Sequence, residues 1–96
     1  MNRYRLSAAA QRDLSEIWDY TERRWDSNQA ENYMQQIRSA VEHIAADPGR
    51  GRAVNEIREG YRRFATGSHV LFYRVRPKGV DVIRVLHQRM DPTRHL

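Results

Sequence analysis

The sequence contains no cysteine, a single lysine and no long run of apolar residues. Without cysteine no disulfide can staple the chain, and this absence fits a reducing compartment. No apolar run approaches the roughly 20 residues that span a bilayer, and the segment from Met1 to Arg5 lacks the apolar region of a secretory signal. We therefore expect an unprocessed, cytoplasmic protein that has no membrane partner.

The positive charge of the chain is carried almost entirely by arginine. Its 96 residues have a net charge of +5, and Lys78 is the one lysine among 17 basic residues. Such a surplus predicts an acidic partner, and the planar guanidinium suits bidentate contacts to carboxylate or phosphate. A GC-rich genome and a solvated surface would explain the arginines equally well, so charge does not identify the partner. The length predicts one domain, residues 1–96, near the lower limit for burying a core unaided.

Helical periodicity is clear in the first half of the chain. Ser7 is expected to cap a helix that ends near Arg24, and Ser27 or Asn28 to cap a second helix that Asp47-Pro48-Gly49 ends. The short connection forces the helices to be antiparallel neighbours. Their apolar stripes are Ala10, Leu14, Ile17, Trp18, Thr21 and Trp25, then Ala30, Tyr33, Met34, Ile37, Val41, Ile44 and Ala45.

The second half of the chain is rich in β-forming residues. Val70 to Tyr73 are apolar at consecutive positions, which is typical of a strand covered on both faces. The helical hairpin can cover one face. No further element is predicted to cover the other, so we expect part of that face to stay open, to curl on itself or to be covered by another polypeptide. The predicted strands are 4–6, 61–66, 69–76 and 80–88, with a loop or short strand at 50–59.

Three stretches of this half carry a family resemblance. They read Gly60-Tyr61-Arg62-Arg63, then Gly67-Ser68-His69-Val70-Leu71-Phe72-Tyr73-Arg74-Val75, then Val85-Leu86-His87-Gln88-Arg89-Met90-Asp91. With the order β-α-α-β-β-β, they resemble the ParE toxins of the RelE/ParE superfamily over essentially the whole chain. The resemblance implies an α+β fold, with a helical hairpin packed on a small antiparallel sheet, and the toxin role in a type II toxin–antitoxin system.

The superfamily contains two activities, and the last two predicted strands discriminate between them. ParE toxins resemble gyrase poisons without chemistry of their own, whereas RelE-like members cut mRNA on the ribosome, using Arg at the phosphate and Tyr, His or Glu for proton transfer. Here Val70 replaces that Arg, and Gln88 follows His87 where nucleases carry Tyr. Arg84 is expected on the opposite strand face from His87 unless a bulge intervenes.

We therefore expect a non-enzymatic inhibitor of DNA gyrase that blocks replication and has no catalytic residues. One alternative is a ribosome-dependent mRNA endonuclease of the same fold, with substitute groups such as Glu56, Arg58 or Arg74. Another alternative is a non-toxic binding module that helps its antitoxin repress their operon. The three functions differ in whether mRNA is cut, whether DNA damage is induced, and whether only the affinity of the antitoxin for its operator changes.

Neither a metal nor a cofactor is expected. The histidines show no paired ligand spacing, and no phosphate-binding loop or nucleophile motif occurs. Trp18, Trp25 and Tyr33 lie at helical spacing and are expected in the core, with an aromatic site for a base or a peptide as the alternative. Tyr20 falls off the stripe and is expected to be exposed. His69 is expected to be either a turn or strand-entry residue or a functional one, and His87 to be either functional or bonded to the sheet. The histidines are His43, His69, His87 and His95.

The resemblance also implies the partners. A ParD-like antitoxin would form a hetero-oligomer with the chain, fold a helix and an extended segment over it, and provide its only link to DNA. The antitoxin contacts are expected from Arg58, Arg62, Arg63, Tyr73, Arg74 and Arg84, although solvated arginines would give the same pattern. Contacts with gyrase are expected from His87, Gln88, Arg89, Met90 and Asp91, with a frayed terminus as the alternative.

Overall fold

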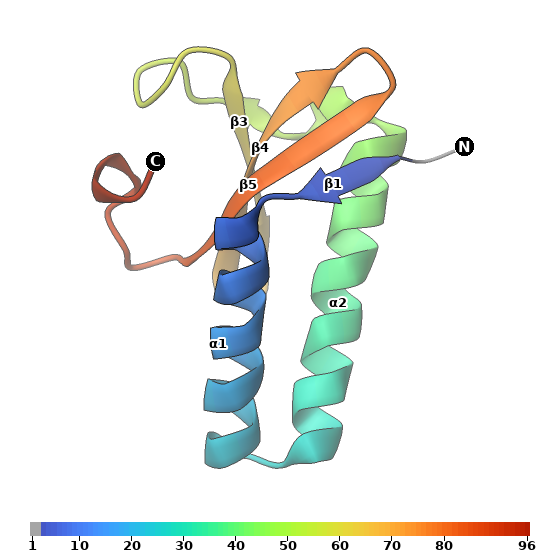
Figure 1. Cartoon of the computed structure of the whole chain (residues 1–96), viewed down its shortest axis with the longest axis vertical. Helices are drawn as coiled ribbons and strands as arrows, with labels where there is room; N and C mark the ends of the chain where they lie inside the picture. The colour runs from blue at the N-terminus through green and yellow to red at the C-terminus, as the bar shows by residue number, and fades with distance from the viewer. Residues whose placement is uncertain (1–2) are drawn as a thin grey trace.

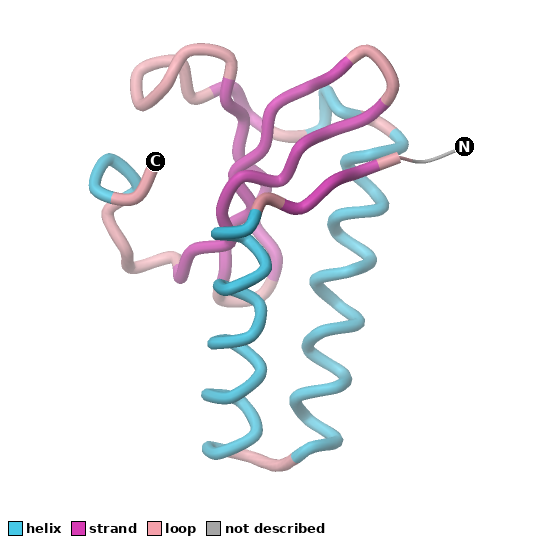
Figure 2. Tube along the Cα trace, in the orientation of Figure 1, coloured by secondary structure: helices cyan, strands magenta, loops and turns pink. Residues whose placement is uncertain are grey.

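Two helices pack against one face of a five-stranded sheet in a computed structural model that describes residues 3–96 (Figure 1, Figure 2). Met1 and Asn2, the start of the segment expected to lack a signal, lie outside the described residues. The α+β class is confirmed. The elements are β1 (Tyr4–Leu6), α1 (Ala8–Arg24), α2 (Ser27–Ala46), η1 (Pro48–Arg50), β2 (Arg52–Ala53), β3 (Tyr61–Thr66), β4 (His69–Arg76), β5 (Gly79–His87) and η2 (Pro92–Arg94).

The helix boundaries follow the capping chemistry of the sequence. Ser7 caps α1 as predicted, because its hydroxyl accepts a 2.9 Å hydrogen bond from the amide of Ala10. The cap of α2 is Asp26, whose carboxylate accepts from the amide of Gln29 at 2.7 Å. The prediction of Ser27 or Asn28 was therefore wrong by a residue or two, since a carboxylate also complements the positive end of the helix dipole.

The sheet is mixed, with strand order β1-β5-β4-β3-β2. The prediction of an antiparallel sheet is wrong at β1, which pairs in parallel with residues 80–82 of β5. A bulge shifts the register of β4 and β5 at Ile83, so Val82 and Val85 both face the helices although they are three residues apart. Ser7 ties α1 to this point, because its hydroxyl donates to the Ile83 carbonyl at 2.6 Å.

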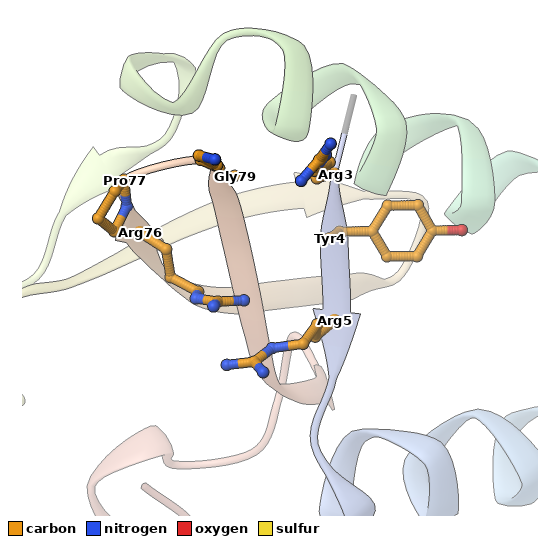
Figure 3. A pocket seen from close by; sticks show the side chains of 7 residues that line it. Arg3, Tyr4, Arg5, Arg76, Pro77 and Gly79 are labelled. Atoms are coloured by element: carbon orange, nitrogen blue, oxygen red, sulfur yellow. The ribbon is translucent and has the colours of Figure 1, made fainter. Parts of the chain in front are cut away.

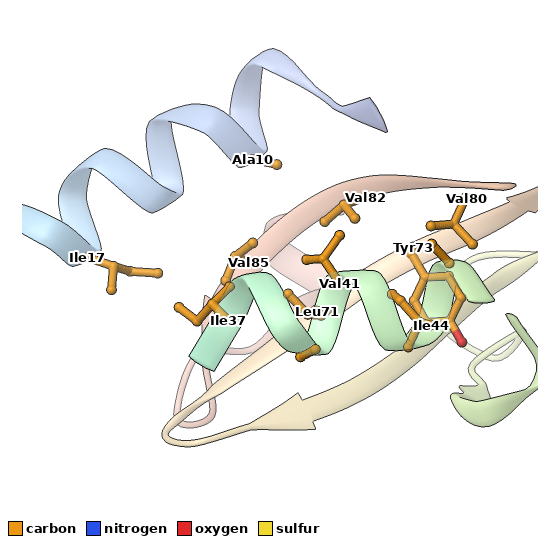
Figure 4. Packing of buried hydrophobic residues seen from close by; sticks show 12 residues of the cluster. Ala10, Ile17, Ile37, Val41, Ile44, Leu71, Tyr73, Val80, Val82 and Val85 are labelled. Carbon is orange, nitrogen blue, oxygen red and sulfur yellow. The ribbon is translucent and has the colours of Figure 1, made fainter. Parts of the chain in front are cut away.

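The main core lies between the helical hairpin and the sheet (Figure 4). The predicted stripe of α2 is confirmed, and in α1 the stripe holds as far as Thr21. Trp18 is half-buried rather than part of the buried cluster. The buried residues of this cluster are Ala10, Ile17, Ile37, Ala40, Val41, Ile44, Ala45, Leu71, Tyr73, Val80, Val82 and Val85.

A second, smaller core covers the opposite face of the sheet, where Val70, Phe72 and Leu86 pack against Val54. Ile57, Tyr61 and Leu96 complete this cluster. The expectation that this face has no covering element was wrong, because the segment between β2 and β3 folds over it and the chain end returns to it. Among the described residues, no helix combines the length and apolarity needed to cross a bilayer.

Candidate functional site

A groove of about 640 Å³ lies where the α1–α2 hairpin passes the ends of β4 and β5. Within residues 3–96, four large apolar side chains are exposed, and Tyr20, Trp25 and Met90 among them line this groove. The fourth is Val75, which lies elsewhere. The groove, named here the hairpin groove, is lined by Asp13, Glu16, Ile17, Tyr20, Thr21, Arg24, Trp25, Gln29, Tyr33, Ser68, His69, Val85, His87 and Met90.

The exposed aromatics of this groove come from the turn end of the hairpin. Tyr20 is 60% exposed, as predicted, but Trp25 is 65% exposed and its assignment to the core was wrong. The hairpin extends past the sheet at this end (Figure 1), so no opposing layer buries Trp25. An apolar surface of this kind, gathered at one place on a chain that is otherwise polar, is typical of a protein-docking site.

The floor of the groove is a cluster of three rings. His69 pairs with His87 across β4 and β5, and their ring centroids are 5.3 Å apart. The hydroxyl of Tyr33 lies 2.6 Å from Nδ1 of His69 and accepts from the amide of Ser68 at 3.0 Å. Burial, helped by the charge that His87 can carry, lowers the pKa of His69 to about 4. His69 is therefore neutral near pH 7, and the cluster fastens α2 to the sheet.

Beside the groove, Arg84 and Asp13 form a bidentate ion pair. Nε and Nη2 of Arg84 donate to the two carboxylate oxygens of Asp13, both at 2.8 Å. The same carboxylate accepts from the amide of Val85 at 2.9 Å, beyond the stretch of β5 that β1 covers. The hydrogen bonds that Arg84 donates to Asp13 raise the pKa of the guanidinium. Nη1 of Arg84 also donates to the carbonyl of His95 at 3.1 Å, so the pair holds the chain end as well.

Asp13 was missed in the sequence because a charged residue next to an apolar stripe is usually solvated. It is 7% exposed. The available signal was its spacing, since it lies three residues after Ala10 and four before Ile17, on the face that meets the sheet. Arg84 was expected to contact an antitoxin, whereas in the structure its half-buried guanidinium donates to Asp13 and to the His95 carbonyl.

Tyr73 was also expected to contact a partner, and the structure places it in the core. It is 0% exposed; its hydroxyl donates to the Pro48 carbonyl at 2.7 Å and accepts from the Gly51 amide at 2.9 Å. Arg62 binds the same connection, since its Nε donates to the Gly51 carbonyl at 2.9 Å. These two residues therefore secure the passage from α2 into the sheet.

The remaining arginines of the expected antitoxin set are spread over the sheet and its loops. Arg58 lies over the ring of Tyr61 at 5.7 Å, and Nε of Arg74 lies 3.7 Å from Asp81. Arg63 is half-buried on β3. The six residues proposed from the sequence do not form one surface, whereas the groove that the structure forms contains none of them.

The five residues expected to contact the target divide into two groups. His87 and Met90 line the hairpin groove, while Gln88, Arg89 and Asp91 are exposed outside its lining. The amide of Arg89 donates to Nδ1 of His87 at 3.1 Å, which fixes the turn after β5. Asp91 caps η2, and hydrogen bonds from Thr93 lower the pKa of its carboxyl.

Of the four positions compared with RNA-cleaving relatives, Val70, Arg84, His87 and Gln88, only His87 lines the groove. Val70, at the position where nucleases carry Arg, is 4% exposed and belongs to the second core on the other sheet face. The bulge at Ile83 precedes Arg84, so strand alternation continues to His87, and the two side chains line different hollows. Within residues 3–96 no cluster of three His, Asp or Glu could hold a metal ion. The arrangement is suited to binding a partner through apolar contacts.

Known proteins resemble this chain along nearly its full length. Residues 4–92 match the family described as "ParE toxin of type II toxin-antitoxin system, parDE". "Toxin ParE1" of Mycobacterium tuberculosis H37Rv is 55% identical over 96 residues, covering 99% of this chain and 98% of that protein. "Toxin ParE1" of Caulobacter vibrioides is 49% identical, covering 100% and 99%, and "Toxin ParE" of Escherichia coli is 30% identical, covering 95% and 89%.

A solved structure has the same fold. It is described as "Chromosomal ParDE TA system from P. aeruginosa" and superposes with a TM-score of 0.77 at 19% identity, covering 91% of this chain and 96% of that one. The likeness at this identity supports the arrangement of helices and strands.

Proposed function

This chain belongs to the ParE toxin family of type II toxin–antitoxin systems, and we propose that it binds a ParD-like antitoxin in the hairpin groove and, once released, inhibits DNA gyrase without catalysis. The proposed site of action is the cytoplasm. The antitoxin contact is proposed because three of the four exposed large apolar side chains in residues 3–96 gather in one groove.

An antitoxin segment would supply what the groove lacks, namely an apolar cover. Tyr20 and Trp25 present aromatic faces at the turn end of the hairpin, and Met90 adds a flexible thioether from beyond β5. Arg24 lies among them, with its guanidinium 5.8 Å from the ring centre of Trp25, and provides a cation for an acidic side chain. An amphipathic segment that folds on binding fits such a surface.

The antitoxin contact is tested with serine substitutions of exposed apolar residues. Because truncating a central aromatic anchor costs about 2 kcal/mol or more, we expect Trp25→Ser and Tyr20→Ser each to raise the Kd for purified antitoxin about 30-fold. Val75→Ser is the matched control, since Val75 is 50% exposed but lies outside the groove, and its Kd should stay within about 2-fold. Titration calorimetry measures all three. Equal effects of all three substitutions would contradict the proposed groove.

The absence of catalysis is proposed on the positions that differ from RNA-cleaving relatives. A cleaved phosphodiester needs a cation at the phosphate and groups that transfer protons. Val70 is buried where those relatives carry the phosphate-binding Arg, Gln88 replaces a Tyr, and Arg84 lies outside the groove and is paired with Asp13. The gyrase target itself rests on the family resemblance, which implies that the toxin binds the enzyme and traps its cleaved-DNA intermediate.

Expression of the chain without antitoxin separates this function from its alternatives. Gyrase poisoning should induce the DNA-damage response and leave mRNA intact. A ribosome-dependent nuclease should produce codon-biased mRNA cuts that disappear in His87→Ala. A non-toxic co-repressor should produce neither effect and still change the operator affinity of the antitoxin. Sequencing of mRNA ends and a damage-response reporter, measured in the same cells, distinguish these outcomes.

A further inference from the structure

A basic corner lies on the sheet face opposite the helices, at the end that carries the β4–β5 turn. Two cross-strand rows form it. In the first row, Arg5 of β1 and Arg74 of β4 flank Asp81 of β5, since both are its register partners. In the second row, Arg76 of β4 is the register partner of Gly79.

Arg3 continues the second row on the other side of Gly79. The amide of Val80 donates to the Arg3 carbonyl at 3.2 Å. A Cβ at Gly79 would collide with that carbonyl oxygen, so only glycine lets the backbone of Arg3 approach this closely. Arg3, Arg5, Arg76 and Lys78 line one hollow of about 590 Å³. Figure 3 shows Arg5 and Arg76 pointing toward each other across β5, while Tyr4 points away from them.

Most of the surplus charge of the protein is concentrated in this corner. Residues 3–5 and 74–81 contain five cations against the single carboxylate of Asp81, which leaves four of the chain's net +5. Asp81 is 13% exposed and is already shared, lying 3.2 Å from Nε of Arg5 and 3.3 Å from Nη1 of Arg76. Arg3 and Lys78 make no ion pair within the part of the chain that the structure describes. The corner therefore has cations that are not neutralised within the described chain and can bind an anion with several charges.

The form of the corner favours a phosphate backbone over an acidic protein segment. A stable protein contact needs apolar anchors at its centre, and none of the exposed large apolar residues in the described chain lines this hollow. Contacts to a nucleic-acid backbone need only cations, and guanidinium groups match phosphate oxygens in geometry. The arginines of one strand repeat at two-residue spacing, which is about 7 Å, and so can follow an extended row of charges.

We propose that the corner formed by Arg3, Arg5, Arg74, Arg76 and Lys78 binds the sugar-phosphate backbone of duplex DNA directly, independently of sequence. This differs from the expectation that the toxin meets DNA only through its antitoxin. It does not depend on gyrase being the target, because any duplex offers the same phosphates. It also leaves the hairpin groove free for a protein partner, since the two sites share no lining residue.

The test is the salt dependence of duplex binding by the full chain, measured by fluorescence anisotropy with a short labelled duplex of mixed sequence. Four neutralised phosphates predict a slope of log affinity against log salt of about −3.6, or roughly a 150-fold loss between about 50 and about 200 mM salt. The double variant Arg3→Gln, Lys78→Gln leaves the pairs of Asp81 intact. It should reduce the slope to about −1.8 and the loss to about 12-fold.

The control variant removes two cations from elsewhere. Arg12→Gln with Arg23→Gln, both on exposed positions of α1, has the same net charge as the test variant and should retain the slope of the original chain. Equal losses in the two double variants would overturn the proposal, because binding would then follow net charge alone. Absence of duplex binding, or tighter binding of a polyglutamate peptide than of the duplex, would overturn it as well.

Two complexes would show which DNA duplex the corner binds. The same two double variants are compared in the antitoxin complex on operator DNA and in gyrase bound to its DNA. Weaker assembly with Arg3→Gln, Lys78→Gln, but not with the α1 control, supports the proposal and names the operator or the gyrase-held duplex as the source of phosphate. No difference in either assembly contradicts it.

Discussion

The buried pair of Asp13 and Arg84 makes the sharpest stability prediction. In Asp13→Ala, Arg84 loses two 2.8 Å hydrogen bonds and the amide of Val85 loses its 2.9 Å acceptor. Removing one member of a buried ion pair costs about 3 to 5 kcal/mol. Since the Arg84 side chain is 22% exposed and can recover some water, we expect the lower value of about 3 kcal/mol. For a domain of this size, that corresponds to a Tm about 12 to 24 °C lower.

Urea denaturation followed by circular dichroism measures this loss. Asp19→Ala is the control, because Asp19 is an exposed carboxylate on the same helix, and its cost should stay within about 0.5 kcal/mol. Adding Arg84→Met to Asp13→Ala removes the orphaned charge and should recover part of the loss. A cost below about 1 kcal/mol for Asp13→Ala, or strict additivity in the double variant, would refute the reasoning.

Three further predictions concern the core, the groove and the turns. Tyr73→Phe should lower the unfolding free energy by about 1 to 3 kcal/mol in urea, because a buried backbone amide loses its acceptor. The pKa of His69 falls from 6.5 to about 4 on folding, so the unfolded chain binds the extra proton between these values. The contribution of His69 to the free energy of unfolding should therefore be fully present above pH 6.5 and should fall by about 1 kcal/mol, after solvent screening, as the pH decreases toward 4. His69→Phe should flatten this part of the curve of stability against pH. Gly79→Ala should cost about 3 kcal/mol, because its Cβ would collide with the Arg3 carbonyl, whereas Gly60→Ala, at φ +84° with open space around it, should cost about 1 kcal/mol.

The helices and the three long strands could be predicted because local periodicity determines them. The stripe from Ala30 to Ala45 repeats at helical spacing, and each of its members is at least partly buried. The β-rich runs are bounded by Gly67-Ser68 and Pro77-Lys78-Gly79, and β3 and β4 occupy the residues predicted for them. Such periodic patterns can be recognised in a single sequence because each helix or strand must present an apolar face to the core.

Contacts between distant segments were not predictable in the same way. Leu96 covers Leu86 and its neighbours from the end of the chain, and no periodicity marks a single residue that docks across the fold. Trp25 fits the helical spacing of the apolar stripe, but it is exposed because the hairpin extends beyond the sheet at its turn (Figure 1). Asp13 is buried because Arg84, 71 residues away, neutralises it. The burial or exposure of each of these residues depends on contacts between elements that are distant in the sequence. The spacing of residues along one helix or strand does not predict such contacts.

The candidate site was also predicted only in part from the sequence. The sequence placed His87 and Met90 near the end of the last strand, and both line the hairpin groove. The antitoxin contacts chosen from the sequence were five arginines and Tyr73, and three of these residues, Arg62, Tyr73 and Arg84, make hydrogen bonds within the molecule. The groove is lined by residues of the α1–α2 hairpin, the β3–β4 turn and the end of β5, and only the assembled fold brings these segments together.

We propose that this ParE family member inhibits gyrase without catalysis. The supercoiling of relaxed plasmid by purified gyrase tests this proposal when it is measured with and without the chain freed from its antitoxin, followed by detergent and protease to expose trapped breaks. We expect loss of supercoiling together with linear plasmid, and rescue of supercoiling when the antitoxin is restored. Full supercoiling by gyrase in the presence of folded chain that is toxic in cells would rule out gyrase inhibition as the function.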